Sequence, residues 1–257
     1  MDWLLVILSL IVLWIASLCK IIHTSSSPSR TFFLSNGGAF CKKNVLLVVA
    51  HPDDESMFFS PTISYLISRG HNLHILCLSI GNADGMGNAR KHELYKACAV
   101  LKVPLQKVNV LDRPELQDGF GQIWDHNLLA RIIKEEVSRH EIDVIITFDG
   151  YGVSGHCNHC DVHYGVRRLL QENPQSLQAW ELVSTNIFRK YSGPIDIWLS
   201  MLLAIKDTDR MHCLLNEQPK KSFHAMSEHS SQWVWFRKLF VSFSSYTYVN
   251  TLRKINV

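Results

Sequence analysis

The sequence predicts one α/β domain in which a mainly parallel sheet is covered by helices on both faces. Two observations predict this fold class. Short, wholly apolar runs of strand length recur along the chain, and the longer stretches between them keep apolar side chains at helical spacing. Such alternation of strand and helix is typical of a parallel sheet between two helical layers. The 257 residues, 47% apolar and 19% charged, are enough to bury one large core.

Each expected strand is a short apolar run, and each expected helix is a longer segment with one apolar side. We expect strands at residues 45–49, 73–79, 108–111, 143–148 and 182–188, and helices at residues 88–101, 127–140, 159–170 and 195–215. In the first two of these helices the apolar side chains recur three and four positions apart, as on one face of a helix. The last forty residues have no pattern that assigns an element, and we find no internal repeat.

An apolar run of 17 residues, 3–19, precedes this domain and is interrupted only by Ser9 and Ser17. Its length is at the lower limit for a membrane-spanning helix, and Lys20 can snorkel and extend it to residue 22. A cleaved signal peptide is the competing interpretation. However, no basic residue precedes Trp3, and the run is long for the apolar part of a signal peptide. We therefore expect an anchor.

The chain is expected to divide into a transmembrane anchor at residues 1–22, a linker at 23–42 and the α/β domain at 43–257. Basic residues follow the apolar run, so the charge-asymmetry rule places the domain in the cytosol. The seven cysteines fit free thiols in a reducing compartment better than a disulfide network. A formal charge of only +3, without a run of like charges, argues against a nucleic-acid partner.

Two polar motifs follow the two strands that are most clearly predicted. Residues 50–55 read Ala-His-Pro-Asp-Asp-Glu directly after the first strand, and residues 154–159 read Ser-Gly-His-Cys-Asn-His after the strand at 143–148. Because the carboxyl ends of parallel strands meet at one edge of a sheet, the two motifs can meet in space. The turn after the first strand contains neither a Gly-rich nucleotide-binding pattern nor a phosphate-binding lysine.

Imidazole and carboxylate groups from two loops suit a hydrolytic zinc site, which has three His or Asp ligands and an open position for water. The metal lowers the pKa of that water to about 7, and a carboxylate that is not a ligand can accept its proton. Asp53 and Asp54 are adjacent and point in different directions, so one can bind metal while the other acts as base. His156 and His159 lie three apart, so one ring can face the metal and the other the substrate.

Ala-His-Pro-Asp-Asp-Glu followed by a later His-x-x-His resembles the LmbE-like zinc-dependent N-deacetylases, over most of the chain from residue 45 onward. The resemblance implies a Rossmann-like three-layer fold and a catalytic zinc ion or another divalent metal. It also implies roles for individual residues. By that resemblance, zinc is bound by His51, Asp54 and His159, the general base is Asp53, and His156 stabilises the oxyanion or protonates the leaving amine.

The resemblance also assigns substrate contacts. Arg90 and Asp118 correspond to an arginine and an aspartate through which bacterial members contact their sugar. One departure concerns residues 156–159, which read His-Cys-Asn-His where many bacterial relatives have His-Pro-Asp-His. A tuning role of that bacterial aspartate therefore does not transfer to this chain.

Within the family, three features resemble the eukaryotic members that act on N-acetylglucosaminyl-phosphatidylinositol. They are the anchor, the Ser-Gly-His-x-Asn-His motif and residues 229–233, His-Ser-Ser-Gln-Trp. The resemblance implies that this glycolipid is deacetylated in the second step of GPI-anchor biosynthesis, at the endoplasmic reticulum membrane. There are two alternatives: the chain deacetylates another N-acetyl sugar, or it binds the glycolipid without turnover and keeps the metal pocket. The sequence predicts neither the native metal nor the oligomeric state.

Some single features have simpler explanations. Helix capping accounts for one aspartate of residues 50–55, although not for His-Pro and three acids together. His163, one turn after His159, is an alternative ligand or faces the same pocket. Cys157 and Cys160 form a lone Cys-x-x-Cys, which is weak evidence for structural zinc. Residues 233–240 combine aromatics with two cations, which suits either a lipid headgroup boundary or a buried aromatic helix.

Overall fold

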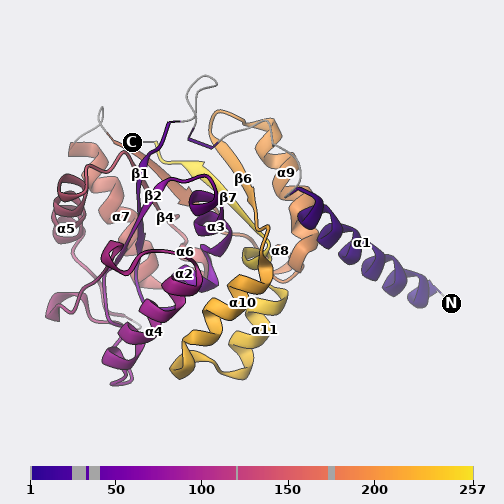
Figure 1. Cartoon of the computed structure of the whole chain (residues 1–257), viewed down its shortest axis with the longest axis horizontal. Helices are drawn as coiled ribbons and strands as arrows, with labels where there is room; N and C mark the ends of the chain where they lie inside the picture. The colour runs from indigo at the N-terminus through magenta and orange to yellow at the C-terminus, as the bar shows by residue number, and fades with distance from the viewer. Residues whose placement is uncertain (1, 25–32, 35–40, 120, 173–176, 257) are drawn as a thin grey trace.

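The computed structural model describes residues 2–24, 33–34, 41–119, 121–172 and 177–256. Its centre is a seven-stranded sheet in the order β3-β2-β1-β4-β5-β7-β6 (Figure 1). The strands are β1 (Asn44–Val49), β2 (Asn72–Cys77), β3 (Val108–Val110), β4 (Val144–Phe148), β5 (Gln178–Leu182), β6 (Met211–Leu215) and β7 (Val249–Lys254). β1 to β5 are parallel, and β7 is antiparallel to both β5 and β6. The predicted mainly parallel sheet is therefore confirmed.

Helices cover both faces of this sheet, as the sequence predicts (Figure 1). The helices are α1 (Asp2–Thr24), α2 (Asp54–Met57), α3 (Ser60–Ser68), α4 (Gly87–Val100), α5 (His126–Arg139), α6 (Gly152–Gly155), α7 (Cys157–Glu172), α8 (Ile187–Lys190), α9 (Asp196–Lys206), α10 (Pro219–Glu228) and α11 (Trp235–Phe243). Short 3-10 turns include η3 (Gly193–Ile195) and η4 (Ser230–Gln232). α3, α4 and α10 bury apolar side chains on one face, and α5 and α7 on the other.

The core has two halves because successive side chains of a strand point to opposite faces of the sheet. Val45, Leu47 and Val49 of β1 join the cluster under α3 and α4, whereas Leu46 and Val48 join the cluster under α5 and α7. Burial on both faces explains why β1 is one continuous apolar run rather than an alternating one.

The structure corrects two elements. The strand expected at residues 182–188 lies at Gln178–Leu182, because the chain leaves the sheet after Leu182. The helix expected at residues 195–215 ends at Lys206, and its last part is β6, which pairs with β7. A short apolar run cannot be assigned to helix or strand by periodicity when its strand partner lies far along the chain.

The expected linker at residues 23–42 falls largely outside the described residues. Phe33, which is described, is buried and its ring lies 5.1 Å from that of Trp180 on β5. At least this residue packs on the domain. The three domain boundaries stay a prediction.

α1 is long and apolar enough to cross a membrane, by its length and composition, over Trp3–His23. Its first part projects away from the domain, and its last part packs on it (Figure 1). Ser17 and Ile21 are fully buried, and the indole of Trp198 on α9 donates a hydrogen bond of 2.9 Å to Ser17 Oγ. Since this contact lies at the β6 and α9 edge, α1 emerges from the opposite side of the molecule to α5 and α7.

Candidate active site

The two motifs meet at the carboxyl edge of the sheet, as the parallel topology predicts. His51, Asp53 and Asp54 follow β1 and lead into α2, while His156 and His159 lie at the start of α7, beyond β4. Ring nitrogens of His51, His156 and His159 all lie within 4.8 Å of one another. Residues separated by a hundred positions thus share one buried site.

One carboxylate oxygen of Asp54 accepts hydrogen bonds from the backbone, and the other faces His159 in the site. Its Oδ2 accepts the backbone N–H groups of Ala50 (3.0 Å) and His51 (2.8 Å), and its Oδ1 lies 3.2 Å from Nε2 of His159. Burial by itself raises the pKa of Asp54, but His159, His51 and the backbone N–H hold it well below its ordinary value. The carboxyl group is therefore ionised at neutral pH.

His51 is oriented by Asn158. Its Nε2 lies 3.1 Å from Oδ1 of Asn158 and 3.1 Å from Oδ1 of Asp118. Because the Asn158 amide N–H donates to the carbonyl of Gln122, Oδ1 is the accepting atom, and Nε2 of His51 must donate to it. In the neutral ring the lone pair then belongs to Nδ1, which lies 3.9 Å from Asp54 Oδ2.

His159 is oriented in a similar way by backbone and an aromatic ring. Its Nδ1 lies 3.0 Å from the carbonyl of Gly152, so Nδ1 carries the proton, and the ring stacks on Phe148 with centroids 4.1 Å apart. Neutral His159 therefore presents the lone pair of Nε2 to Oδ1 of Asp54, at 3.2 Å. Two acceptor atoms at this distance need a proton or a cation between them. The imidazole nitrogens of His51 and His159 and the carboxylate of Asp54 therefore fit a divalent metal ion as ligands.

The acidic side chains around His51 raise its pKa. Burial by itself lowers its pKa, but the hydrogen bond to Asp118 and the charge of Asp54 raise it above its ordinary value. The acids around the ring thus favour a positive charge on it, and a metal ion at Nδ1, on the side of Asp54, can take the place of a second proton. His156 differs, since burial and the neighbouring His159 lower its pKa to about 4.

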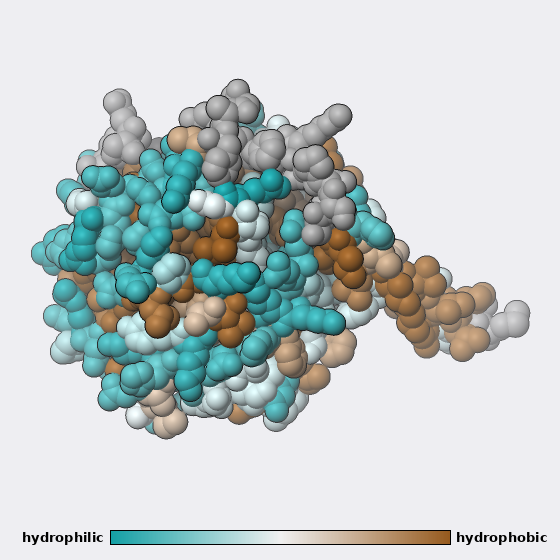
Figure 2. Space-filling view, viewed as in Figure 1, coloured by the Kyte–Doolittle hydropathy of each residue, from teal (hydrophilic) through white to brown (hydrophobic). Residues whose placement is uncertain are grey.

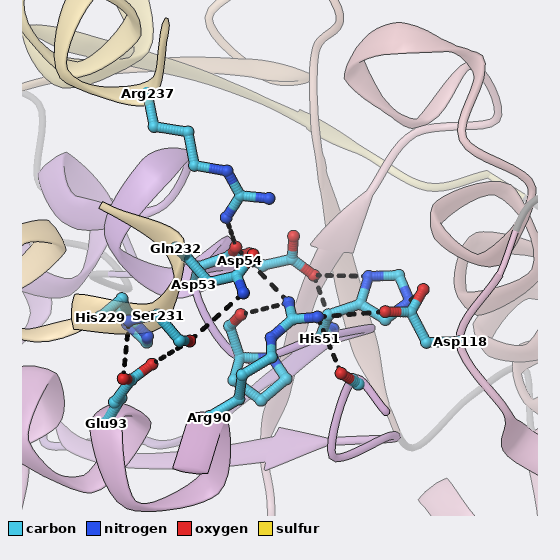
Figure 3. Close-up of polar contacts among 12 residues, drawn as sticks. His51, Asp53, Asp54, Arg90, Glu93, Asp118, His229, Ser231, Gln232 and Arg237 are labelled. Carbon is cyan, nitrogen blue, oxygen red and sulfur yellow. Dashed lines mark hydrogen bonds and ion pairs between the residues drawn. The ribbon is translucent and has the colours of Figure 1, made fainter. Parts of the chain in front are cut away.

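Asp53 lies beside this donor set and faces two arginines (Figure 3). Its Oδ2 pairs with the guanidinium of Arg237, and Nη2 of Arg90 lies 3.5 Å away. The backbone of Asp53 has φ 112°, a conformation that costs roughly 1–3 kcal/mol outside glycine. Its N–H donates to Oε2 of Glu55 at 3.0 Å, which helps to hold this conformation. Only Oδ2 of Asp53 takes part in these ion pairs, and its role as general base stays a prediction.

Arg90 and Asp118 both reach the site, as the resemblance implies. Arg90 donates to the carbonyls of Gly81 and Pro52, both at 2.9 Å, and to Oδ2 of Asp118 at 3.2 Å. Burial by itself raises the pKa of Asp118, but the hydrogen bond from His51 and the charges of His51 and Arg90 lower it. Arg90 therefore joins the turns around the site, and its contact with a sugar stays a prediction.

A segment near the C-terminus packs beside the first motif (Figure 3). Nε2 of His229 lies 2.7 Å from Oε1 of Glu55, and neither side chain is exposed. Glu93 accepts the N–H of Ser231 at 2.8 Å and its hydroxyl at 2.6 Å. The sequence analysis missed these partners and the Arg237 contact, because each joins residues more than a hundred positions apart. Two signals pointed to them without pairing them, the third acid of the first motif and residues 229–233, which the sequence analysis singled out by resemblance.

His163 does not share the His159 site. Its Nδ1 lies 3.1 Å from the carbonyl of Phe148 and 3.3 Å from Oε2 of Glu181, and it lines a separate cavity of about 410 Å³. Cys157 and Cys160 are both free thiols, as are the other five cysteines, all of which the structure describes.

The chain is similar to known deacetylases over most of its length. The family described as GlcNAc-PI de-N-acetylase (PIG-L) matches residues 46–170. The N-acetylglucosaminyl-phosphatidylinositol de-N-acetylase of Bos taurus is 38% identical over 221 residues, which are 85% of this chain and 85% of that protein. The probable enzyme of the same name from Schizosaccharomyces pombe is 38% identical over 218 residues, 82% of this chain and 87% of that protein.

Solved structures share the fold. N,N'-diacetylchitobiose deacetylase from Pyrococcus horikoshii is similar with a TM-score of 0.60 and 13% identity, covering 83% of this chain and 84% of that one. The zinc-inhibited form of a teicoplanin deacetylase is similar with a TM-score of 0.56 and 12% identity, covering 82% of this chain and 97% of that one. At such identities the likeness establishes the fold alone.

Proposed function

The chain belongs to the PIG-L family of GlcNAc-PI de-N-acetylases, and we propose that it hydrolyses the acetamide of N-acetylglucosaminyl-phosphatidylinositol to glucosaminyl-phosphatidylinositol and acetate. This reaction is the second step of GPI-anchor biosynthesis. The observation that carries the proposal is the convergence of Asp54 Oδ1 with the ring nitrogens of His51 and His159, beside the carboxylate of Asp53.

His51, Asp54 and His159 would hold zinc or another divalent ion. When bound, the metal supplies a water molecule whose pKa is lowered to about 7. Each of these side chains is oriented by another contact: His51 by Asn158, Asp54 by backbone N–H groups, and His159 by the Gly152 carbonyl. Each contact leaves one atom of the side chain free to bind the metal. His156 is the competing third ligand, since one of its ring nitrogens lies within 4.8 Å of those of His51 and His159.

Asp53 acts as the general base in this proposal. Its ion pairs with Arg90 and Arg237 engage Oδ2 and hold the carboxylate in place, which leaves Oδ1 to accept the proton of the attacking water. His156, whose ring centroid lies 4.8 Å from that of His159 and 5.0 Å from that of His51, is placed to stabilise the oxyanion or to protonate the leaving amine. Without a proton, the amine cannot leave.

Substrate contacts and location belong to the same proposal. Asp118 and Arg90 form the sugar-binding side of the site, next to His51. α1 anchors the chain in the endoplasmic reticulum membrane, where its lipid-linked substrate lies, with the domain on the cytosolic side.

Metal content and acetate release, measured together on a synthetic glycolipid, test the proposal. We expect Asp53→Ala to keep its metal and to lose acetate release by about 10²–10⁴-fold. His51→Ala, Asp54→Ala and His159→Ala should lose metal as well. His156→Ala should keep metal and lose activity, and the exposed His224→Ala is the control that changes neither. Full activity of Asp53→Ala overturns the assignment of the base, and loss of metal in His156→Ala with retention in Asp54→Ala overturns the ligand set.

A further inference from the structure

α11 turns its apolar face outward, in contrast to an ordinary surface helix, which buries that face. Trp235 is 72% exposed, Phe236 53%, Leu239 49% and Phe243 50%. These positions fall on one side of the helix at 100° per residue. The opposite side carries Arg237, which pairs with Asp53, and the buried Val241.

Exposed apolar side chains also lie on neighbouring elements. On α8, Phe188 is 86% exposed, and directly after this helix the ring of Tyr191 lies 6.2 Å from that of Phe240 on α11. On α9, Leu202 and Ile205 are exposed. We call the exposed apolar side chains of α8, α9 and α11 the docking surface.

The docking surface adjoins α1. A Cβ added at Gly193 in η3 would lie 3.0 Å from Nε1 of Trp14 on α1 and 3.5 Å from the carbonyl oxygen of Phe243 on α11, so the two helices meet there. Trp198 on α9 contacts Ser17 of α1. Figure 2 shows α1 as a continuous hydrophobic rod that leaves the domain at this side.

The length of the projecting part of α1 indicates that a bilayer covers this surface. Residues 3–13, the part that projects freely, span roughly 16 Å at 1.5 Å per residue, about half of a hydrocarbon layer of roughly 30 Å. The remaining half of the apolar helix includes Ser17 and Ile21, which are buried against the domain. If α1 crosses the bilayer, the side of the domain beside these residues must enter it too. The surface that would enter is apolar and exposed.

We propose that α8, α9 and α11 form a second membrane-docking surface, which enters the headgroup and upper acyl region of a phospholipid bilayer beside α1. The proposal rests on the anchoring role of α1 under the proposed function and extends it. Trp235 and Tyr191 suit the interface, and Lys238, whose Nζ lies 5.6 Å over the ring of Trp233, is placed for anionic headgroups.

This arrangement sets the distance between the bilayer and the site. Arg237 reaches Asp53 from the inner side of α11 (Figure 3), while in this proposal the outer side of the same helix meets lipid. The site therefore lies more than one helix diameter, roughly 10 Å, from the docking surface. A sugar on a phosphoinositol headgroup can reach it while the acyl chains stay in the bilayer.

Photocrosslinking in liposomes tests the contact without any need for activity. The full chain, reconstituted in phosphatidylcholine and phosphatidylserine with radiolabelled acyl chains, carries p-benzoylphenylalanine in place of Phe236, of Leu8 on α1, or of Tyr164 on α7. Tyr164 is the matched control, because it is an exposed aromatic residue of the α5 and α7 layer. We expect lipid adducts at Phe236 and Leu8 and none at Tyr164.

The outcomes separate the claims. Lipid adducts at Leu8 without any at Phe236 overturn the docking surface and leave the anchor. The absence of lipid adducts at both positions overturns the docking surface and the anchor. The acetate-release assay tests the proposed reaction independently of these crosslinks. A protein–protein adduct at Phe236 in place of a lipid adduct means that a second copy of the chain covers α11, and it overturns the proposal as well.

Kinetics provide a second test with closely matched leucines. Leu239→Ser should raise KM for the bilayer-embedded glycolipid by about tenfold, since one Leu side chain no longer enters the lipid, and should leave kcat/KM for a deacylated, soluble analogue unchanged. Leu105→Ser, at a position 50% exposed on the short turn before β3, should change neither. An equal KM for Leu239→Ser and the unchanged chain contradicts the proposal.

Discussion

Oδ1 of Asn158 lies 3.1 Å from Nε2 of His51, although the two residues are 107 positions apart. The contact joins the two motifs through their side chains, and it fixes which nitrogen of His51 is free for a metal. Asn158 therefore orients a proposed metal ligand, in the position where many bacterial relatives have an aspartate.

Replacing Asn158 should weaken metal binding without removing a ligand. We expect Asn158→Ala to lower metal affinity by about 10–100-fold, the usual effect of removing a partner that orients a metal ligand. Asn158→Asp should recover most of the affinity, because a carboxylate also accepts from Nε2. Competition with a chelator measures the affinity, and circular dichroism checks the fold. Unchanged metal binding by Asn158→Ala would show that His51 is oriented by other contacts.

Arg90 and Arg237 both pair with Asp53, but they differ in burial. Arg90 is buried and donates to two carbonyls and to Asp118, whereas the side chain of Arg237 is 22% exposed. We expect Arg90→Ala to lower the free energy of unfolding by about 3–5 kcal/mol, because it leaves buried acceptors unpaired. Arg237→Ala should cost less, because Arg90 still pairs with Asp53. Denaturant unfolding measures both, and equal losses would contradict this difference.

The buried pair of Glu55 and His229 makes stability depend on pH. Burial by itself lowers the pKa of His229, but the charge of Glu55 and the hydrogen bond to it raise it above the ordinary 6.5. The folded chain therefore holds this proton to a higher pH than the unfolded chain does. The contribution to stability is fully present below pH 6.5 and is lost as the pH rises through the folded pKa.

We expect the free energy of unfolding to fall as the pH rises above 6.5, and His229→Gln to remove this part of the pH dependence. At pH 6 the substitution should cost about 3–5 kcal/mol, because it leaves Glu55 buried without its partner. His224→Gln, at an exposed position of α10, is the matched control and should leave both quantities unchanged. A pH slope that persists in His229→Gln would assign the effect to another group.

The sequence predicts best what is buried on both sides or tied to a parallel strand. β1 and β4 are continuous apolar runs, and the polar residues after them had to share one edge of the sheet. That reasoning is enough to bring His51 and His159 together. It cannot find the contacts of Asp53 and Glu55 with the C-terminal segment, because nothing local marks a partner 184 or 174 positions away.

α11 shows why the sequence pattern of the last forty residues does not predict their helices and strands. Its apolar side faces out, and its inner side carries Arg237, so the usual relation between apolar spacing and burial is reversed. β6 was mistaken for a helical extension because its partner β7 comes more than thirty residues later. Both errors arise from tertiary contacts that override local pattern.

The junction of α1 and α11 can be tested at Gly193, which has φ +61°. Gly193→Ala adds backbone strain and also places a methyl group 3.0 Å from Nε1 of Trp14. Gly70 is the matched control, because its φ is +74° and an added Cβ would meet nothing within 4 Å. Gly70→Ala therefore reports only the strain, about 1–2 kcal/mol. We expect Gly193→Ala to cost more, with faster proteolysis of the part of α1 that packs on the domain. Since the two substitutions share their backbone strain, equal unfolding free energies and equal proteolysis would mean that Trp14 does not press against η3 in solution.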